Sequence, residues 1–173
     1  MNLKKIFIII FLFFSFNLSL NAGVPHYLDF KLILNESDAG KKAQNFLKKK
    51  LENGIADIKK KEKDIQENEK KIIQQKKIIS ADEYKKKVSE LRNKVSALQK
   101  ERGKLLENVA KQRSKARKEI LNNLNPIVKN YMNEKKIRMV IDKKNILLAD
   151  DTLDITKEIM SLLNKKLKSI NLN

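Results

Sequence analysis

The sequence predicts a mainly α-helical protein with a small β part, in which a long antiparallel coiled-coil hairpin projects from a small β/α body. Three observations favour this fold class. The charged stretch from Lys41 to Lys118 contains no proline and carries apolar residues at the three- and four-residue spacing of a coiled coil. A helix-restart signal lies near its middle, at residues 80–83. Short β-prone stretches flank it on both sides.

The first 22 residues have the pattern of a secretory signal peptide. Lys4 and Lys5 precede an apolar run over Ile6–Phe16, and the segment then becomes small and polar up to Ala22. The alternative is a membrane anchor, but an anchor needs about 20 apolar residues and this run is shorter. We expect cleavage near Ala22, so that the protein works outside the cytosol.

The formal charge of +18 would fall to +16 if Lys4 and Lys5 left with the signal peptide. Such a charge favours anionic partners, namely nucleic acid, acidic lipid surfaces or acidic polypeptides. Export of the protein from the cytosol argues against nucleic acid as the partner. The alternative to an anionic partner is that the lysines only keep the helix faces solvated. The chain has no cysteine, which excludes a disulfide framework and thiolate chemistry.

Residues 23–36 are assigned to the body. The chain is β-prone from Val24, and His26–Phe30 lead into a short helix or turn. A single strand without a neighbour in sequence must pair with a distant one. Asn35–Asp38 are rich in capping residues, which predicts the start of the first long helix there.

Residues 37–124 are predicted to form the arm, with its tip near residues 79–82. Ser80 and Glu83 have the spacing of a capping box that starts the returning helix. The apolar seam of the outgoing helix repeats every seven residues, at Leu51, Ile58, Ile65, Ile72 and Ile79. The returning seam is Val88, Leu91, Val95, Leu98, Leu105 and Val109. Polar residues such as Glu62, Arg102 and Gln112 interrupt the seam, so we expect a weakly packed, bendable hairpin.

Residues 125–173 complete the body. The apolar stripe widens after Arg117, as suits burial in a core, and Pro126 is expected to kink the helix. Ile137–Asp142 alternates like a strand, residues 143–145 form a turn, and Ile146–Ala149 returns, which together predict a β-hairpin. The last helix is expected from near Asp154. We expect the first strand to join this hairpin, so that both chain ends build one body.

The sequence offers few residues in the arrangements that catalysis requires. His26 is the only histidine, which excludes triads and metal sites that need several histidines. Asp150, Asp151 and Asp154 superficially resemble a Mg²⁺-diphosphate motif, but aspartates before a helix more often cap it. We therefore expect no enzyme, no cofactor and no metal.

Several stretches together resemble the Skp (OmpH-like) family of periplasmic chaperones. Tyr27–Phe30 and Asn35–Gln44 are similar to the family's opening, while Met139–Asp142, Asp154–Thr156 and Leu162–Asn164 are similar to its closing hairpin and last helix. The likeness covers nearly all of the chain after residue 22. It implies a homotrimer whose strands form a β body, with three helical tentacles around a cavity that holds unfolded outer-membrane proteins without ATP.

The residues expected to carry these roles fall into two sets. The client-binding set on the arm is Lys59, Lys60, Lys61, Lys63, Ile65, Ile72 and Ile79. The trimer-forming set in the body is Tyr27, Leu28, Phe30, Ile137, Met139 and Ile141. Trimerisation would pool three small cores and cover strand edges. Anionic lipid or lipopolysaccharide is a further expected partner, and nucleic acid is not.

Other functions remain open on the sequence alone. A membrane-anchored or envelope-located structural coiled-coil stalk would keep residues 1–22 as an anchor. A cytosolic prefoldin-like chaperone also has coiled-coil arms, but its strands lie between its helices and it has no leader. The intact or cleaved N-terminus separates these possibilities.

Overall fold

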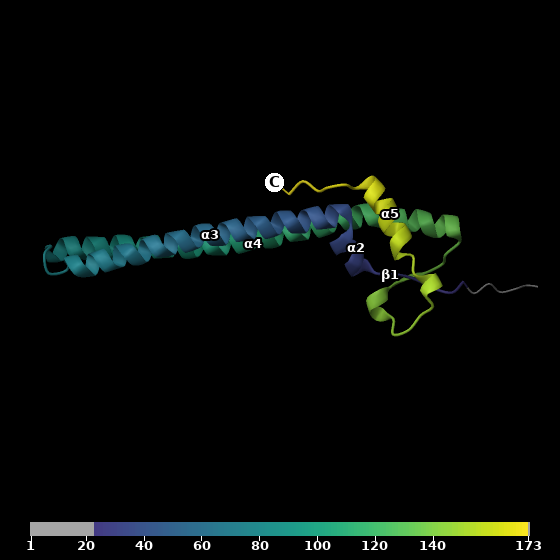
Figure 1. Ribbon diagram of the computed structural model, residues 1–173, viewed down its shortest axis with the longest axis horizontal. Coiled ribbons are helices and arrows are strands. Elements are labelled where there is room, and N and C mark those ends of the chain that lie inside the picture. The colour runs from purple at the N-terminus through teal and green to yellow at the C-terminus, as the bar shows by residue number, and fades with distance from the viewer. Residues whose placement is uncertain (1–22, 173) are drawn as a thin grey trace, which may run out of the picture.

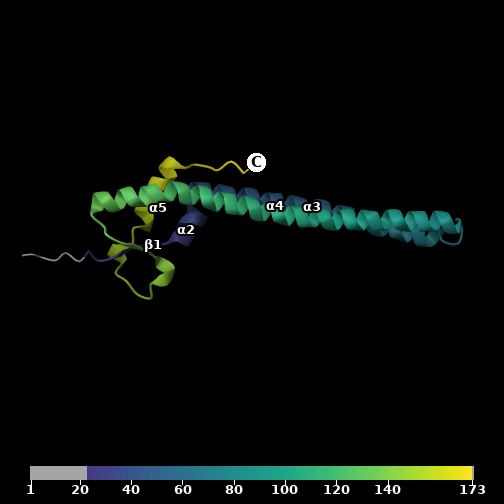
Figure 2. The same ribbon diagram turned by 180° about the vertical axis from the view of Figure 1, so that it is seen from behind.

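The computed structural model describes residues 23–172, and the expected signal peptide, residues 1–22, lies outside them. Two long helices, α3 (Asp38–Gln75) and α4 (Ala81–Lys135), lie side by side as an extended hairpin (Figure 1). At about 1.5 Å per residue, α3 is about 57 Å long. The small elements gather at the other end from the tip (Figures 1 and 2), so the arm-and-body fold class is confirmed.

Serine caps start both arm helices. The Ser37 hydroxyl accepts a hydrogen bond from the Gly40 amide, and the Ser80 hydroxyl accepts one from the Glu83 amide, each at 3.2 Å. These are the contacts that the capping sequences predict. The outgoing helix ends at Gln75 and the returning helix begins at Ala81, so the turn begins a few residues earlier than the sequence suggested.

The predicted seam lies between the two arm helices. Ile58, Leu98 and Val109 are buried, and the other predicted seam residues are half-buried except Val95, which is exposed. Two of the polar interruptions face each other, because Arg102 of α4 pairs with Glu62 of α3. Lys61 pairs with Glu101 beside them. The breaks in the seam are therefore matched across the arm.

The body contains a two-stranded parallel sheet, β1 (His26–Leu28) and β2 (Val140–Asp142), with Tyr27 opposite Ile141. Tyr27 also bridges Asp154 on the other side of β1. Parallel strands need a long crossover connection, and here the whole arm supplies it. The expected union of the first strand with the C-terminal part is confirmed.

The predicted β-hairpin over residues 137–149 is wrong. The Asp142 carboxylate accepts a hydrogen bond from the Lys144 amide at 3.2 Å and starts a 3₁₀ turn, η1 (Lys143–Asn145). The chain beyond it forms no strand: Leu147 and Leu148 are 97% and 89% exposed. A second 3₁₀ turn, η2 (Asp151–Leu153), precedes the last helix.

The core of the body lies where α4 meets two short helices, α2 (Phe30–Glu36) and α5 (Thr156–Lys166). Its fully buried members are Ile33, Leu124, Ile159 and Leu163. Pro126 lies inside α4 without ending it. The helix ends instead at Lys136, whose φ of 57° is left-handed, and Ile137 then folds back to donate to the Met132 carbonyl at 2.8 Å.

Candidate functional site

The arm exposes apolar side chains along its length. Ile73 and Ile78 near the tip are 60% and 83% exposed, and Leu106 on α4 is 56% exposed. Ile55 and Val95 are also exposed. Much of the surface of these side chains is left uncovered by the hairpin, so the arm presents repeated small apolar surfaces to whatever lies beside it.

Grooves lie along the arm between its helices, and two of them have apolar linings near predicted site residues. The distal groove has a volume of about 540 Å³, and its apolar lining comes from both helices: Ile72, Ile73, Tyr84, Val88, Leu91 and Val95. A second groove, of about 310 Å³, includes Ile65, Leu98 and Lys61 in its lining. Both are shallow and open, which suits weak contacts with an extended chain better than enclosure of a small molecule.

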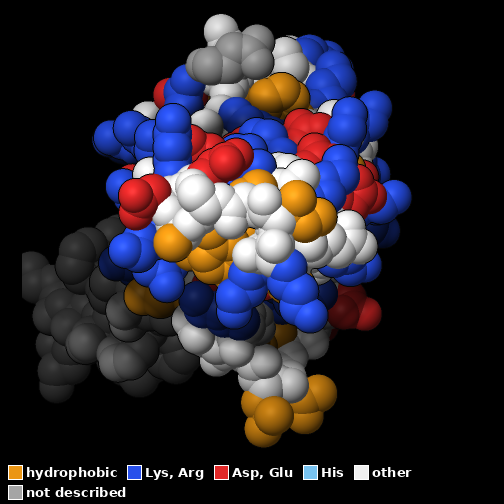
Figure 3. All heavy atoms as spheres, turned by 90° about the vertical axis from the view of Figure 1, so that its left-hand side faces the viewer, with side chains coloured by type: hydrophobic (Ala, Val, Ile, Leu, Met, Phe, Trp, Pro, Cys, Tyr) orange, Lys and Arg blue, Asp and Glu red, His pale blue; other side chains and the backbone are white. Residues whose placement is uncertain are grey.

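Charge surrounds these apolar surfaces. The outgoing segment, residues 41–77, has thirteen Lys against six acidic residues, and the returning segment, residues 80–123, has thirteen Lys or Arg against six. Each segment therefore carries a formal charge of +7. Seen end-on from the arm tip, blue Lys and Arg side chains surround a paler patch that contains orange hydrophobic groups (Figure 3).

The predicted client-binding lysines lie on the exposed surface of α3, but not all are free. Lys61 pairs with Glu101 across the arm, and the Lys63 ammonium lies 4.0 Å from the Glu67 carboxylate. Lys59 and Lys60 are exposed. Of these four lysines, Lys61 lines a groove, and the other three lie on the outer face of the helix.

The predicted apolar set is half-buried in the seam. Ile65 and Ile72 each line one of the two grooves, and Ile79 lies at the turn. Sequence reasoning missed the more exposed Ile73 and Ile78, which stand one position away from the seven-residue repeat. That offset was the available signal, since a residue beside a seam position points away from the partner helix.

The predicted trimer-forming set divides by burial. Tyr27, Leu28 and Ile137 belong to the chain's own core, and Phe30 and Ile141 are half-buried. Met139 is 53% exposed. Together with the exposed Leu147 and Leu148, it leaves apolar surface on the body that residues 23–172 do not cover.

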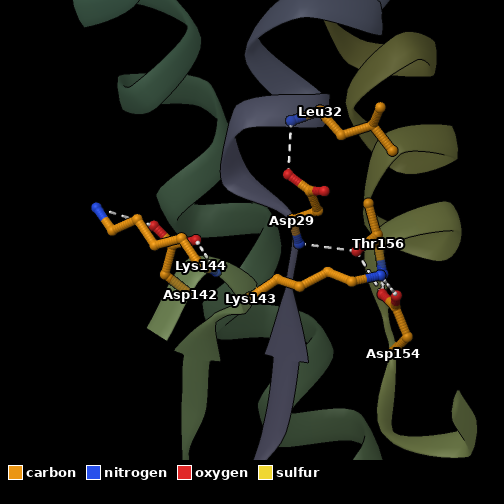
Figure 4. A network of polar contacts seen from close by, with 7 residues as sticks. All are labelled: Asp29, Leu32, Asp142, Lys143, Lys144, Asp154 and Thr156. Atoms are coloured by element: carbon orange, nitrogen blue, oxygen red, sulfur yellow. Dashed lines mark hydrogen bonds and ion pairs between the residues drawn. The ribbon is translucent and has the colours of Figure 1, made fainter. Parts of the chain in front are cut away.

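A polar network holds the body together around Lys143 (Figure 4). Its ammonium pairs with Asp154 at 3.0 Å and lies 5.4 Å from the centre of the Tyr27 ring. The Thr156 hydroxyl accepts a hydrogen bond from the Asp29 amide at 2.8 Å, which ties α5 to the first strand. The Asp154 carboxylate in turn accepts from the Thr156 amide.

This network shifts the acidity of its members. Burial raises the pKa of Asp154, but hydrogen bonds from Thr156 and Lys143 outweigh that effect and hold the pKa below its usual value. Burial and the neighbouring Asp154 raise the pKa of Tyr27. The Asp154 contact raises the pKa of Lys143. The cluster acts as a structural joint, and Asp150 likewise caps a turn by accepting from the Thr152 amide at 2.8 Å.

Within residues 23–172, no group of three or more His, Cys, Asp or Glu side chains is placed to hold a metal ion. In the same part of the chain, no helix combines the length and the apolar character needed to cross a membrane.

Comparisons with known proteins agree with this architecture. The model of a family described as "Outer membrane protein (OmpH-like)" matches residues 26–163. A crystal structure from Caulobacter crescentus, provisionally described as an outer membrane chaperone (OmpH-like), superposes with a TM-score of 0.77 at 20% identity, covering 86% of this chain and 89% of that one. No curated protein matches the chain.

Proposed function

The chain belongs to the OmpH-like family, and we propose that it is an ATP-independent holdase chaperone of the periplasm that keeps unfolded outer-membrane proteins from aggregating. The observation that carries this proposal is the arm itself. More than half of the described chain is spent on a charged hairpin whose apolar side chains stand singly in solvent.

The arm chemistry suits many different clients. An unfolded outer-membrane protein offers apolar residues at intervals along a flexible backbone, with no fixed shape to recognise. Shallow grooves and separated Ile and Leu side chains can each make a weak contact, and several such contacts add up because they are linked. The lysines would attract acidic client segments and anionic lipid or lipopolysaccharide, with a strength that salt reduces.

The proposed assembly is a homotrimer formed through the body. Among the described residues, the far edge of β2 has no neighbouring strand, and Met139, Leu147 and Leu148 leave apolar side chains uncovered. Covering these groups with two further copies would remove the edge and enclose a space between three arms. Three arms of high positive charge would repel one another and stay apart at low salt, which leaves room for a client.

The test replaces Lys59, Lys60, Lys61 and Lys63 by Gln. The variant should suppress aggregation of a urea-unfolded outer-membrane protein less well than the wild type, because the arm loses four of its positive charges. The matched control replaces the exposed body lysines Lys135, Lys157, Lys165 and Lys166 by Gln. Light scattering after dilution of the client, at low and at physiological salt, measures the effect.

The proposal expects partial protection by the wild type at physiological salt, since the exposed Ile and Leu contacts remain. Equal protection by all three proteins at both salt concentrations would mean that the arm lysines only solvate the helix. No protection by the wild type would favour a structural stalk, and recovery of the protein with an intact Met1 in the membrane fraction would support that alternative.

A further inference from the structure

A short segment after the last helix lies against the base of the arm. Residues 167–172, called the strap here, leave α5 and run extended back along the hairpin toward its tip (Figures 1 and 2). The strap follows the end of the region that matches the family model, residues 26–163. Its contacts therefore lie outside the region that the family model matches.

The strap is seated by its apolar side chains. Leu172 is only 4% exposed and packs in a cluster with small and aliphatic residues of both arm helices, namely Ala43, Leu47, Val109 and Ala116. Ile170, two residues earlier, packs against the same cluster. Alternate residues of an extended chain point to the same side, so this spacing is that of a strand laid on a surface. These apolar residues of α3 and α4 form the seat of the strap, which is called the groove below.

The side chain of Gln112 contacts the backbone of the strap. It is one of the polar residues that interrupt the arm seam, it is 9% exposed, and its side-chain amide donates a hydrogen bond to the Leu172 carbonyl at 2.5 Å. Its Oε1 atom has no hydrogen-bond partner among the described residues. A carboxamide can donate to a carbonyl and accept from an N–H of the same extended backbone, whatever the side chains are. Here Gln112 makes the donating hydrogen bond, and its accepting oxygen is left over.

One ion pair also ties the strap to the arm. Lys168 pairs with Asp38 at 3.0 Å, with 64% of the Lys168 side chain and 42% of the Asp38 side chain exposed. An exposed ion pair of this kind contributes little. Away from the strap, the buried seam residues Ile58 and Leu98 hold α3 against α4, so the strap can leave its seat without unfolding the arm.

We propose that the strap occupies a polypeptide-binding groove at the base of the arm and competes there with client segments. The partner that fits is an extended chain with apolar side chains two residues apart, which is the pattern of a membrane β-strand. This inference rests on the proposed chaperone function. A resident occupant lowers the apparent affinity of the groove by the fraction of molecules in which the groove is free.

Leu172→Asp tests the proposal, because a carboxylate should not stay in the apolar seat. Ser169→Asp is the matched control: it adds the same charge to an exposed position of the same segment. Binding of an unfolded outer-membrane protein to each full-length protein is measured by fluorescence anisotropy at fixed salt. Leu172→Asp should bind on the order of tenfold more tightly than the wild type and Ser169→Asp. Leu172→Ala should give a smaller gain and serves if the Asp variant fails to fold.

Adding Gln112→Met to Leu172→Asp should abolish most of that gain, since the groove then loses its contact with the client backbone. Unchanged or weaker binding by folded Leu172→Asp or Leu172→Ala, with normal binding by the wild type, would overturn the competing strap and leave the chaperone function standing. A gain that survives Gln112→Met would overturn the assignment of the groove. Absence of binding by the wild type would overturn both the proposed function and this inference.

Discussion

At Gly40 the close approach of the chain to itself leaves no room for a side chain. A Cβ there would lie 2.2 Å from the Leu34 carbonyl oxygen, which is backbone and can give way only if the main chain shifts. Gly103, in the middle of α4, has nothing within 4 Å of the same position. A steric contact therefore requires glycine at position 40, whereas no packing contact explains the glycine at position 103.

Alanine at these two glycines should change stability in opposite directions. Gly103→Ala should raise the free energy of unfolding by about 1 kcal/mol, because alanine favours a helix interior. Gly40→Ala should lower it by about 1–3 kcal/mol, because the backbone must shift. Urea denaturation followed by circular dichroism, at one protein concentration, checks both. A gain from Gly40→Ala would contradict the close approach of Leu34.

Asp154 should make the body sensitive to acid. Its pKa lies below the usual value in the folded protein, since the hydrogen bonds from Thr156 and Lys143 outweigh burial. A lowered carboxyl pKa stabilises the fold above the unfolded value, about pH 4, and that stability is lost as the pH falls through the folded pKa. Asp154→Asn should therefore destabilise the protein at pH 7 and flatten the loss of stability below pH 4.

Thermal unfolding from pH 2 to 7 measures this effect. Asp151→Asn, at an exposed neighbouring position, is the control and should keep the acid dependence of the wild type. If Asp154→Asn lost stability below pH 4 as much as the wild type does, other carboxylates would be the cause of that loss.

Among the elements, the arm could be predicted from the sequence, whereas the small sheet could be predicted only in part: the region that pairs with the first strand was found, but the hairpin was wrong. The seven-residue repeat and the Ser80 cap are local signals, and both correspond to observed contacts. Strand pairing depends on residues more than 100 positions apart. The alternating stretch after Ile137 looked like half of a hairpin, but Asp142 caps a 3₁₀ turn and β2 pairs in parallel with β1 instead.

The groove residues show the same limit for the candidate site. Ile65 and Ile72 were found because they belong to the repeat. Gln112 was noted only as a break in the seam, since no local pattern says that the strap, 60 residues later, returns to it. The contact between Gln112 and the strap follows from the assembled fold, and no local sequence pattern marks it.

The pair between Glu62 and Arg102 predicts how the arm responds to a continuous seam. Replacing both by Leu should stabilise the arm by about 1 kcal/mol or more, because apolar contact replaces a partly desolvated ion pair. Replacing Arg102 alone should give less, since Glu62 then loses its partner. Thermal unfolding of the two variants measures the difference. A double variant less stable than the single one would contradict this account of the seam.

For the whole molecule, Met139→Asp tests the proposed trimer. Met139 is 53% exposed beside the sheet, and a carboxylate there would be buried without a partner once copies associate, costing several kcal/mol. Leu106→Asp, at 56% exposure on the arm, is the matched control and should leave assembly unchanged. Sedimentation velocity distinguishes the two. A Met139→Asp protein that remains a trimer would exclude this surface from the interface.

The central claim is that three copies together hold an unfolded outer-membrane protein. Native mass spectrometry of the protein purified from the periplasm and mixed with a urea-unfolded client, without nucleotide, tests it most directly. The account predicts a particle of three chains, each beginning near Gly23, with one client bound. Free client beside single chains, or a complex that forms only with ATP, would contradict it.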